Sequence, residues 1–410
     1  MHIETSILLP SATVDFFLKD KETIEAARAL KDDWRFARVQ LRVTEGDVET
    51  AIQLYGSTPS PEIIMIETDT TGAGFIERLG ELSGRCEEGS SAVVIGPVND
   101  VNLYRSLTAM GVSDYLVRPV PQETLSEVIA QTLIEKLGAA GSRLIAMIGA
   151  KGGVGVSTLA QAAALGASDN LGQKTLLLDA AGAWSSLPVG MGYEPVASTA
   201  EVIKAVVAKD NDSLRRMLYS VNDKLTVLAS GTEPMLDIAP QIGQFEDVLN
   251  TVMASYPVVV ADLSGAGPLL KKAVLTRAHE IILVTTPTLA SLRAARSLMQ
   301  EIKKLQGGNA NNIDLVLNMA GIAPGKEIVK ADIKAALDIE PQAVIAFDAK
   351  SYIGAEHEGR KLSADKGAQD SILKILPLIQ KYVARDTGAS IEADKTKLVG
   401  SLLNKLKTKK

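Results

Sequence analysis

A glycine-rich stretch, residues 149–161 with the sequence GAKGGVGVSTLAQ, has the residue types of a phosphate-binding loop. The usual loop reads G-x-x-x-x-G-K-[ST], and its lysine reaches the β- and γ-phosphates of a nucleotide. Here the residue after Gly155 is Val156, and the first glycine position holds Ala150. A lysine does occur earlier in the stretch, at Lys151. The pattern therefore predicts a phosphate loop whose cation has moved.

The other loop residues have the types that nucleotide binding requires. Gly152, Gly153 and Gly155 allow a tight path that turns backbone N–H groups toward an anion, and the following helix adds the positive end of its dipole. Ser157 can offer its hydroxyl to Mg²⁺, and Thr158 can bond a phosphate oxygen. The alternative is a glycine-rich turn without a ligand. We favour nucleotide binding because the loop follows an apolar strand and opens a helix.

A second apolar run, PVVVAD, resembles the strand that carries the metal-binding aspartate of phosphate-loop proteins, and it ends in Asp262. Carboxylate and hydroxyl oxygens are the ligands that Mg²⁺ prefers. We therefore expect Ser157 and Asp262 to hold Mg²⁺, with Asp262 acting directly or through a water molecule. The predicted cofactors are ATP and Mg²⁺.

Composition narrows the class of protein and its partners. The 410 residues suggest two or three domains of roughly 100–200 residues each. The formal net charge of −6 argues against a general nucleic-acid binder, although residues 395–410 hold six lysines and no acid. The only cysteine, Cys86, cannot form an internal disulfide or a CxxC metal site. With no signal-like N-terminus and no apolar run near the roughly 20 residues that span a bilayer, we expect a cytoplasmic protein.

Short apolar runs of strand length alternate with helix-like segments along most of the chain. Such alternation predicts parallel sheets covered by helices. A stretch of small residues, GAAGS, separates two blocks of this alternation. The expected fold is α/β, with a first domain, a linker, a second domain and a basic tail at residues 1–137, 138–142, 143–385 and 386–410.

Eleven runs are the candidate strands of the two blocks. In the first block they are SILL (6–9), EIIMIE (62–67), AVVIG (92–96) and DYLV (114–117). In the second block they are RLIAMIG (143–149), TLLLDA (175–180), LTVLAS (225–230), PVVVADL (257–263), EIILVTT (280–286), DLVLNMA (314–320) and AVIAFD (343–348).

The segment AKGGVGVST resembles the deviant Walker A motif of the MinD/ParA class of ATPases. In that class a second lysine lies just before the glycine pair and reaches across a dimer interface to the partner's nucleotide. Lys151 matches this lysine. The resemblance implies nucleotide-coupled homodimerisation. It also implies nucleotide contacts from a set of nine residues: Lys151, Gly152, Gly153, Val154, Gly155, Val156, Ser157, Thr158 and Asn318.

Two further positions follow from the same resemblance. The class has an acidic pair, D-x-D, after its second strand; here Asp179 matches the first member, as a candidate switch residue, and Ala181 replaces the second. Without that aspartate and without the loop lysine at Val156, we expect weak or absent hydrolysis. Asn318 matches the asparagine that reads the adenine edge, although an asparagine at a strand end is also a common turn former.

A longer series of segments resembles one family more closely. DVNLYRSLTAMGVSDYLVRPV, AKGGVGVST, LPVGMGYEP, EIILVTTPTLASLRAARSLM and LVLNMAG follow one another over most of residues 60–370. This order is similar to the CpaE/TadZ family of Tad (Flp) pilus assembly proteins. Its members join an atypical receiver-like, flavodoxin-like domain to a doubly wound MinD/ParA-type phosphate-loop domain. They mark the site, often a cell pole, where the pilus machine assembles, and they commonly lack the loop lysine.

The receiver resemblance implies a set of positions that this chain only partly fills. A working receiver has an acidic pair after its first strand, which Pro10, Ser11 and Ala12 would follow here. Glu67 lies near the position of the phosphoacceptor aspartate. The Ser/Thr and Lys positions hold Gly96 and Arg118, although Pro119 keeps the following proline. The first domain is therefore predicted to be a docking or dimerisation module, not a phosphorylation switch.

The tail supports two interpretations. On a helix, Leu398, Val399, Leu402, Leu403 and Leu406 fall within about 140° of arc. Basic amphipathic helices of this kind lie on anionic membranes, and MinD relatives use one. A solvated, frayed tail is the alternative, favoured by Gly400 and by the lack of an aromatic anchor.

Four functions compete. The first is an ATP-binding localisation and scaffold protein of a Tad/Flp pilus machine, acting as a homodimer with other Tad proteins, peripheral on the inner membrane at a cell pole. The second is an active MinD/ParA-type partitioning or positioning ATPase acting on DNA or membrane cargo. An iron–sulfur carrier ATPase would need cysteines in residues 143–410, which contain none. A response regulator is disfavoured by the missing receiver acids.

Overall fold

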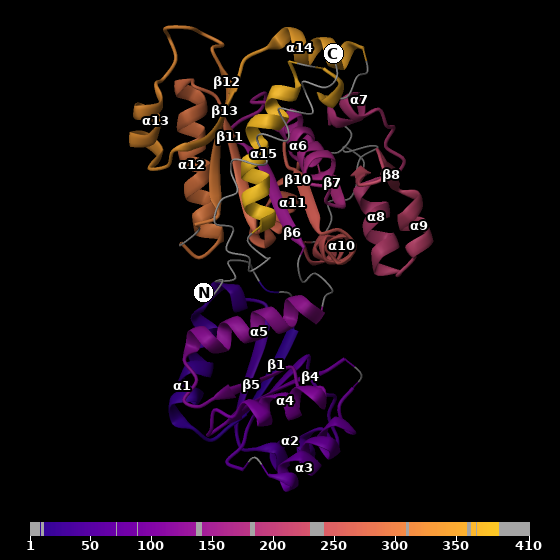
Figure 1. The fold of residues 1–410 in the computed structure, drawn as a ribbon, viewed down its shortest axis with the longest axis vertical. Helices are drawn as coiled ribbons and strands as arrows, with labels where there is room; N and C mark the ends of the chain where they lie inside the picture. The colour runs from indigo at the N-terminus through magenta and orange to yellow at the C-terminus, as the bar shows by residue number, and fades with distance from the viewer. Residues whose placement is uncertain are drawn as a thin grey trace.

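The computed structural model describes most of the chain in two α/β domains, which lie one above the other in Figure 1. No helix in the described part of the chain is long and apolar enough to cross a membrane. The predicted tail and most of the predicted linker lie outside the described residues. The described residues are 9, 12–70, 72–87, 89–136, 142–180, 185–229, 242–308, 311–358, 362–365 and 367–384.

The first domain is a five-stranded parallel sheet with the strand order β2-β1-β3-β4-β5. This order and the helices on its two faces make the domain flavodoxin-like. Its strands are β1 (Ala12–Leu18), β2 (Val39–Glu45), β3 (Ile63–Glu67), β4 (Ser91–Gly96) and β5 (Asp114–Val117). Its α-helices are α1 (Lys21–Ala29), α2 (Val48–Leu54), α3 (Ala73–Ser83), α4 (Val101–Ala109) and α5 (Gln122–Lys136).

The first strand differs from the sequence prediction. Residues 6–8 of the predicted strand lie outside the described residues, and Leu9 is not in a strand; β1 instead covers ATVDFFL. Asp15 interrupts the apolar run of this segment, which hides the strand from a hydrophobicity pattern. The Asp15 side chain is nevertheless buried, because Arg42 and the Tyr55 hydroxyl donate hydrogen bonds to its Oδ2 at 2.8 and 2.7 Å. A buried carboxylate with such partners is tolerated inside a sheet.

The second domain has an eight-stranded sheet with the order β13-β12-β11-β6-β10-β7-β9-β8. Seven strands are parallel, and the short edge strand β8 pairs antiparallel with β9. The seven predicted strands of this block are confirmed, and β8 was not predicted. The strands are β6 (Arg143–Gly149), β7 (Thr175–Asp179), β8 (Leu218–Ser220), β9 (Leu225–Ala229), β10 (Val258–Asp262), β11 (Glu280–Thr285), β12 (Ile313–Ala320) and β13 (Pro341–Ala346).

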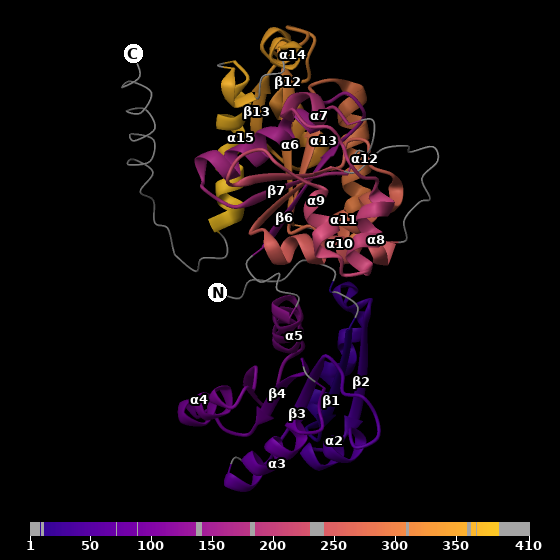
Figure 2. The same ribbon diagram turned by 90° about the vertical axis from the view of Figure 1, so that its right-hand side faces the viewer.

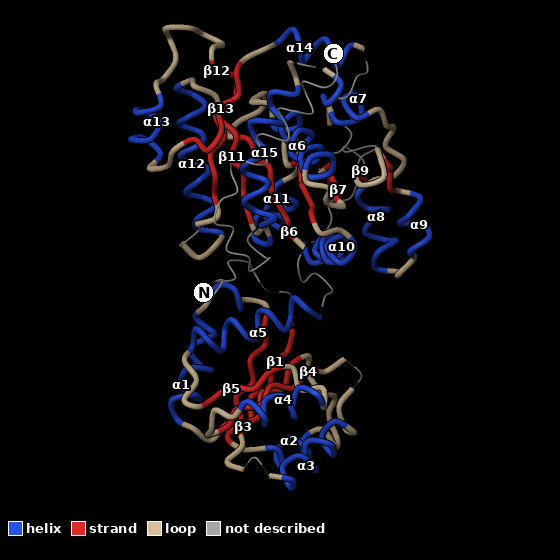
Figure 3. Tube along the Cα trace, in the orientation of Figure 1, coloured by secondary structure: helices blue, strands red, loops and turns tan. Residues whose placement is uncertain are grey.

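Helices cover both faces of this sheet, as the blue and red tubes of Figure 3 show. Strand β6 shows why: Leu144 and Ala146 belong to the apolar core on one face, and Ile145 and Met147 to the core on the other. The α-helices are α6 (Val156–Leu165), α7 (Leu187–Met191), α8 (Thr199–Val207), α9 (Asn211–Arg216), α10 (Ile242–Ser255), α11 (Pro268–Arg277), α12 (Leu289–Leu305), α13 (Lys330–Leu337), α14 (Ala349–His357) and α15 (Gln369–Ala384).

The two domains contact each other below the second sheet (Figure 2). Arg38, just before β2, forms an ion pair with Glu246 of α10. The ring of Trp34 lies so close to Gly307 that a Cβ built at Gly307 would stand 2.2 Å from Trp34 Cδ1. Gly307 also has a φ of +74°, so both the close approach and the backbone require glycine there.

Candidate functional site

The glycine-rich loop lies between β6 and α6, at the carboxyl edge of the sheet. Strand β6 has parallel neighbours on both sides, β11 and β10. Ligands of open α/β sheets bind in the crevice beyond the carboxyl ends of such neighbouring strands. Gly153 and Gly155 have φ values of +77° and +88°, and Gly155 is the residue that caps the N-terminus of α6. The loop lines a cavity of about 880 Å³ that continues between α11 and α12. The helix N-terminus thus begins beside an open cavity, as anion binding requires.

The side chain of Val156 does not substitute for the missing lysine in this loop. It is 4% exposed and belongs to the apolar core beneath α6. A Cβ built at Gly149 would stand only 2.7 Å from its Cγ2, so the valine packs closely against the end of β6. Position 156 therefore stabilises the core and supplies no positive charge to a ligand.

A buried carboxylate and two hydroxyls meet at the end of β10. The Asp262 Oδ1 accepts a hydrogen bond from the Ser264 backbone N–H at 2.9 Å, and the Ser157 and Ser264 hydroxyl oxygens are 3.0 Å apart. Asp262 is fully buried, and its Oδ2 has no hydrogen-bond partner among the described residues. Burial raises the pKa of this carboxyl. Ser264 was not singled out in the sequence, where it appears as an ordinary loop serine.

This arrangement fits Mg²⁺. A buried carboxylate oxygen without a partner is costly, and a cation would satisfy it. Mg²⁺ is usually held by one or two protein oxygens together with phosphate oxygens and waters, not by a full protein cage. In keeping with this, the described residues contain no group of three or more His, Cys, Asp or Glu that could hold a metal alone. Ser157 and Asp262 are thus in position for the role that the sequence predicts.

A second buried carboxylate lies on the neighbouring strand. Asp179 ends β7 and is the register partner of Asp262 across the sheet. Its Oδ2 accepts a hydrogen bond from the buried Tyr193 hydroxyl at 2.8 Å. Burial raises the pKa of Tyr193, and the Asp179 carboxylate raises it further, so the phenol stays protonated. Sequence reasoning missed Tyr193; position 181 of the predicted acidic pair lies outside the described residues.

Asn318 lies next to the loop, but on a strand. Its Nδ2 donates a hydrogen bond to the Val154 carbonyl at 2.8 Å, so its amide holds the loop in place. It therefore forms no turn of its own. Next to it is a second cavity of about 230 Å³, formed by residues of α6, β12, β13 and α14. Its lining includes Gly155, Thr158, Asn318, Phe347 and Tyr352.

Lys151 lies at the surface of the loop. Its side chain is exposed, and its Nζ donates to the carbonyl of the next residue, Gly152, at 3.3 Å. Within the described part of the chain, its side chain makes no hydrogen bond or ion pair with another element. The ammonium is therefore available to a ligand or to a second subunit.

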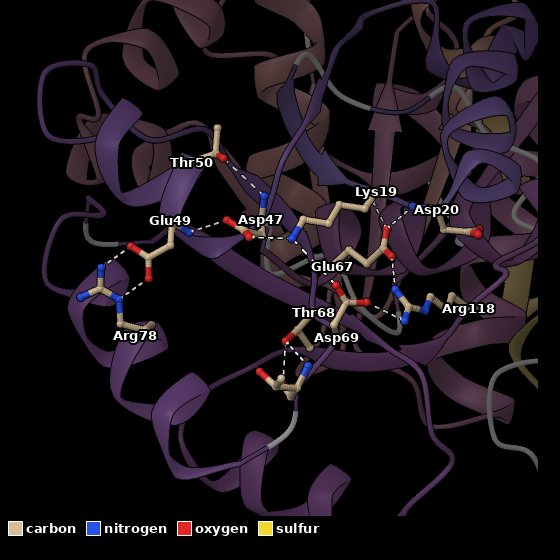
Figure 4. Close-up of polar contacts among 11 residues, drawn as sticks. Lys19, Asp20, Asp47, Glu49, Thr50, Glu67, Thr68, Asp69, Arg78 and Arg118 are labelled. Atoms are coloured by element: carbon tan, nitrogen blue, oxygen red, sulfur yellow. Dashed lines mark hydrogen bonds and ion pairs between the residues drawn. The ribbon is translucent and has the colours of Figure 1, made fainter.

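The receiver-like domain has a separate polar cluster at the carboxyl edge of its own sheet (Figure 4). Glu67 ends β3 and is fully buried. Its Oε2 accepts hydrogen bonds from the backbone N–H groups of Lys19 and Asp20 at 2.6 and 2.8 Å, and its Oε1 pairs with Arg118. Arg118 also pairs with Asp69 at 2.7 Å. Hydrogen bonds to Glu67 and then to Asp69 raise the pKa of Arg118, so the guanidinium stays charged.

The residues after the first strand are not the ones expected. The sequence predicts Pro10, Ser11 and Ala12 there, but Ala12 opens β1, and the residues that follow the strand are Lys19 and Asp20. The Lys19 ammonium pairs with Asp47 at 2.8 Å, and the Asp20 carboxylate caps α1 through Thr23 N at 2.9 Å. The first of these residues is thus not acidic, and the carboxylate of the second is used as a helix cap. The acidic pair that would hold a metal in a working receiver is therefore not present after β1. Gly96 and Arg118 do lie at the ends of β4 and β5, as predicted.

We predict that this cluster does not accept a phosphoryl group. Both Glu67 oxygens are engaged, the side chain is buried, and the Asp69 carboxylate is held by Arg118. Incubation with acetyl phosphate and Mg²⁺ should leave the intact mass unchanged, while a competent receiver treated in parallel gains one phosphate. A stable gain of one phosphate mapped to Glu67 or Asp69 would contradict the prediction.

Comparison with known proteins gives one family model and a group of similar solved structures. A family model described as an AAA domain matches residues 142–315. A pilus assembly protein CpaE from Caulobacter crescentus is 31% identical over 31% of this chain and 96% of its own, with a TM-score of 0.29. A putative CpaE2 pilus assembly protein from Sinorhizobium meliloti is 34% identical over 30% of this chain and 98% of its own, with a TM-score of 0.28. No curated protein matches the chain.

The larger domain has its own counterpart. A ParA family ATPase from Chlorobium tepidum is 20% identical over 58% of this chain and 98% of its own, with a TM-score of 0.50. At this identity the match shows a shared fold.

Proposed function

Because the chain belongs to the CpaE/TadZ family of pilus assembly proteins, we propose that it is an ATP-binding localisation and scaffold protein for assembly of a Tad/Flp type IV pilus secretion machine. The main support for ATP–Mg²⁺ binding is the buried Oδ2 of Asp262, which has no hydrogen-bond partner among the described residues. The Ser157 hydroxyl lies close by, next to Ser264, and the glycine-rich loop beside them lines a cavity. A buried polar atom left unsatisfied in a folded protein calls for a ligand.

Each part of the site has a distinct role in this proposal. The loop N–H groups and the N-terminus of α6 bind the phosphates. Ser157 and Asp262 hold Mg²⁺, which when bound neutralises part of the phosphate charge. The cavity beside Asn318 receives the base, with the aromatic rings of Phe347 and Tyr352 in its lining. Tyr193 fixes the Asp179 carboxylate next to the metal site.

Binding rather than turnover is the proposed activity. Val156 is packed into the core, so no lysine at that position stabilises charge on a transferring phosphoryl group. Ala181 removes the second acid of the D-x-D pair. ATP then acts as a dimerising ligand, and the dimer presents its receiver-like domains to other Tad proteins at the cytoplasmic face of the inner membrane, at a cell pole.

The test is to size the purified protein by ultracentrifugation with and without ATP–Mg²⁺, and to measure phosphate release in the same samples. We expect a monomer that becomes a dimer with ATP and a turnover far below roughly 1 s⁻¹, the lower end of ordinary enzyme rates. Turnover at or above that rate would instead favour an active partitioning ATPase. No ATP binding at millimolar concentration would reject both.

Lys151→Ala is predicted to weaken ATP-dependent dimerisation. The Lys151 ammonium is exposed at the loop surface, and a contact to a phosphate across an interface is charge-assisted, contributing about 1.5–3 kcal/mol. Each subunit contributes one such contact, so the variant dimer loses two, and its dissociation constant should rise roughly a hundredfold or more. Lys204→Ala, an exposed lysine on α8 outside the cavity lining, is the matched control. Equal dimer fractions for the parent and Lys151→Ala would exclude a role across the interface.

A further inference from the structure

The phosphate loop of this chain binds a strongly charged ligand without an obvious cation from its own subunit. A nucleoside triphosphate with one Mg²⁺ keeps about two negative charges, and a charge taken out of water without a partner is costly. Backbone N–H groups orient phosphates but carry no full charge. Val156 is buried in the core, and the exposed Lys151 ammonium is the group that the proposed function assigns to the nucleotide of a second subunit. Some other group of the same subunit must offset the remaining charge whenever the protein binds nucleotide as a monomer.

Two lysines of α11 line the same cavity as the loop. This helix starts at Pro268, six residues after Asp262, so its first turns lie close to the metal site. Lys271 and Lys272 both contribute to the cavity lining, together with the loop residues from Ala150 to Thr158. Within the described part of the chain, neither lysine has an ion pair or a side-chain hydrogen bond. Both ammonium groups are therefore free to meet an incoming anion.

The charges around the cavity agree with this placement. The lining includes three cationic side chains, Lys151, Lys271 and Lys272, and a single acidic one, Glu301 of α12. Other lysines on the chain do have partners: Lys334 pairs with Glu340, and Lys381 with Asp314. The cavity lining thus carries more positive than negative side chains where a phosphate chain would bind. The field of such a cavity attracts anions.

We propose that Lys271 and Lys272 supply, from the same subunit, the positive charge that the phosphate loop lacks, and that they make the site prefer nucleotides with more phosphate groups. This inference rests on the proposed ATP binding and adds the residues that set its specificity. Lysine suits the role, because its ammonium is a compact point charge on a flexible four-carbon stem that can follow a phosphate chain. The N-terminus of α11 adds a weaker positive field in the same direction.

The experiment measures the affinity of monomeric protein for fluorescent ATP, ADP and AMP analogues with Mg²⁺. We compare the parent with Lys271→Ala/Lys272→Ala, at protein concentrations below those at which dimers form. The control is Lys303→Ala/Lys304→Ala, which removes the same charge from the last turn of α12, outside the cavity lining. The double variant of α11 should bind ATP about tenfold more weakly, since each partly exposed contact contributes less than a buried one.

The loss should follow the number of phosphates. We expect the dissociation constant for ATP to rise more than that for ADP, and that for AMP to stay within about twofold. Lys271→Arg/Lys272→Arg should restore most of the affinity, and added NaCl should weaken ATP binding more in the parent than in the alanine variant. If the alanine variant does not fold, Lys271→Gln/Lys272→Gln and the salt series of the parent give the same comparison.

The possible results separate the two proposals. A parent that binds no ATP rejects the proposed function itself. A parent that binds ATP while the α11 variant binds it equally well overturns the role of Lys271 and Lys272 and leaves ATP binding standing. Equal losses for the α11 and α12 variants also overturn it, because the effect would then come from total charge and not from the cavity.

Discussion

Gly155→Ala should abolish detectable ATP binding without unfolding the protein. Gly155 has a φ of +88°, a conformation that an alanine adopts only with strain. Its new Cβ would stand 2.3 Å from Asn318 Nδ2, which must move and so lose its 2.8 Å hydrogen bond to the Val154 carbonyl. Because that bond holds the loop over the cavity, the backbone donors lose their alignment. We expect the dissociation constant for ATP–Mg²⁺, measured by fluorescent-nucleotide titration, to rise at least a hundredfold.

The matched control for this change is Gly111→Ala. Gly111 has a φ of +96°, so alanine meets the same kind of backbone strain, but nothing lies within 4 Å of a Cβ built there and the residue is in the other domain. Backbone strain should cost each variant about 1–2 kcal/mol of stability, and Gly155→Ala about 1 kcal/mol more for the lost Asn318 hydrogen bond, while only Gly155→Ala loses nucleotide binding. ATP binding by Gly155→Ala within threefold of the parent would show that the loop does not hold the phosphates.

Arg118→Ala should strongly destabilise the first domain. Its partner Glu67 is fully buried, and without the guanidinium the carboxylate keeps only two backbone donors, the N–H groups of Lys19 and Asp20. Breaking a buried ion pair by removing one partner typically costs about 3–5 kcal/mol. The two remaining donors reduce this, so we expect a loss of about 2–3 kcal/mol in the free energy of unfolding.

The measurement needs a reporter in the first domain, because two domains do not unfold as a single two-state unit. The chain has two tryptophans, Trp34 and Trp184. In a Trp184→Phe background, Trp34 is the single tryptophan; because its ring also lies against Gly307, its fluorescence follows unfolding of the first domain together with loss of the contact to the second. With a urea dependence of about 1–3 kcal/mol per molar, the midpoint should fall by roughly 1–2 M.

Arg85→Ala is the control for Arg118→Ala. Arg85 is exposed and pairs with the equally exposed Glu81 at 3.1 Å, one helical turn away. Such a pair contributes about 0.3–0.5 kcal/mol, so its loss should barely move the urea midpoint. If both arginine variants shift the midpoint by the same small amount, the Glu67–Arg118 pair does not hold the domain together.

The sequence alone determined the class of fold and the place of the glycine-rich loop within it. Fully apolar strands such as RLIAMIG and PVVVADL can be buried only between two layers of helices, so their order predicts a parallel sheet. The glycine-rich stretch follows such a strand and precedes a helix, so its position in the fold, and those of Ser157 and Asp262, could be predicted from their spacing. In the structure the loop lies between β6 and α6 and lines a cavity, and the Ser157 hydroxyl is 3.0 Å from that of Ser264, two residues after Asp262. Their role in binding a ligand stays a prediction.

Features that depend on contacts between distant segments could not be read from the sequence. Strand β1 could not be predicted because Asp15 interrupts its apolar run. Asp15 can be buried there only because Arg42 and Tyr55, which come from other elements, donate hydrogen bonds to it. Strand β8 is three residues long and exists only by pairing with β9. Neither pattern carries a periodic apolar signal.

The fine structure of the site was decided by the tertiary fold alone. Tyr193 meets Asp179, and Asn318 meets Val154, across 14 and 164 residues of sequence. Lys271 and Lys272 look like ordinary surface lysines of a helix until α11 is placed against the phosphate loop, where they line its cavity. A sequence shows which groups a chain has and how their neighbours fold locally. Which of these groups face one another is set by long-range packing, since that packing fixes the sheet order and the faces on which the helices lie.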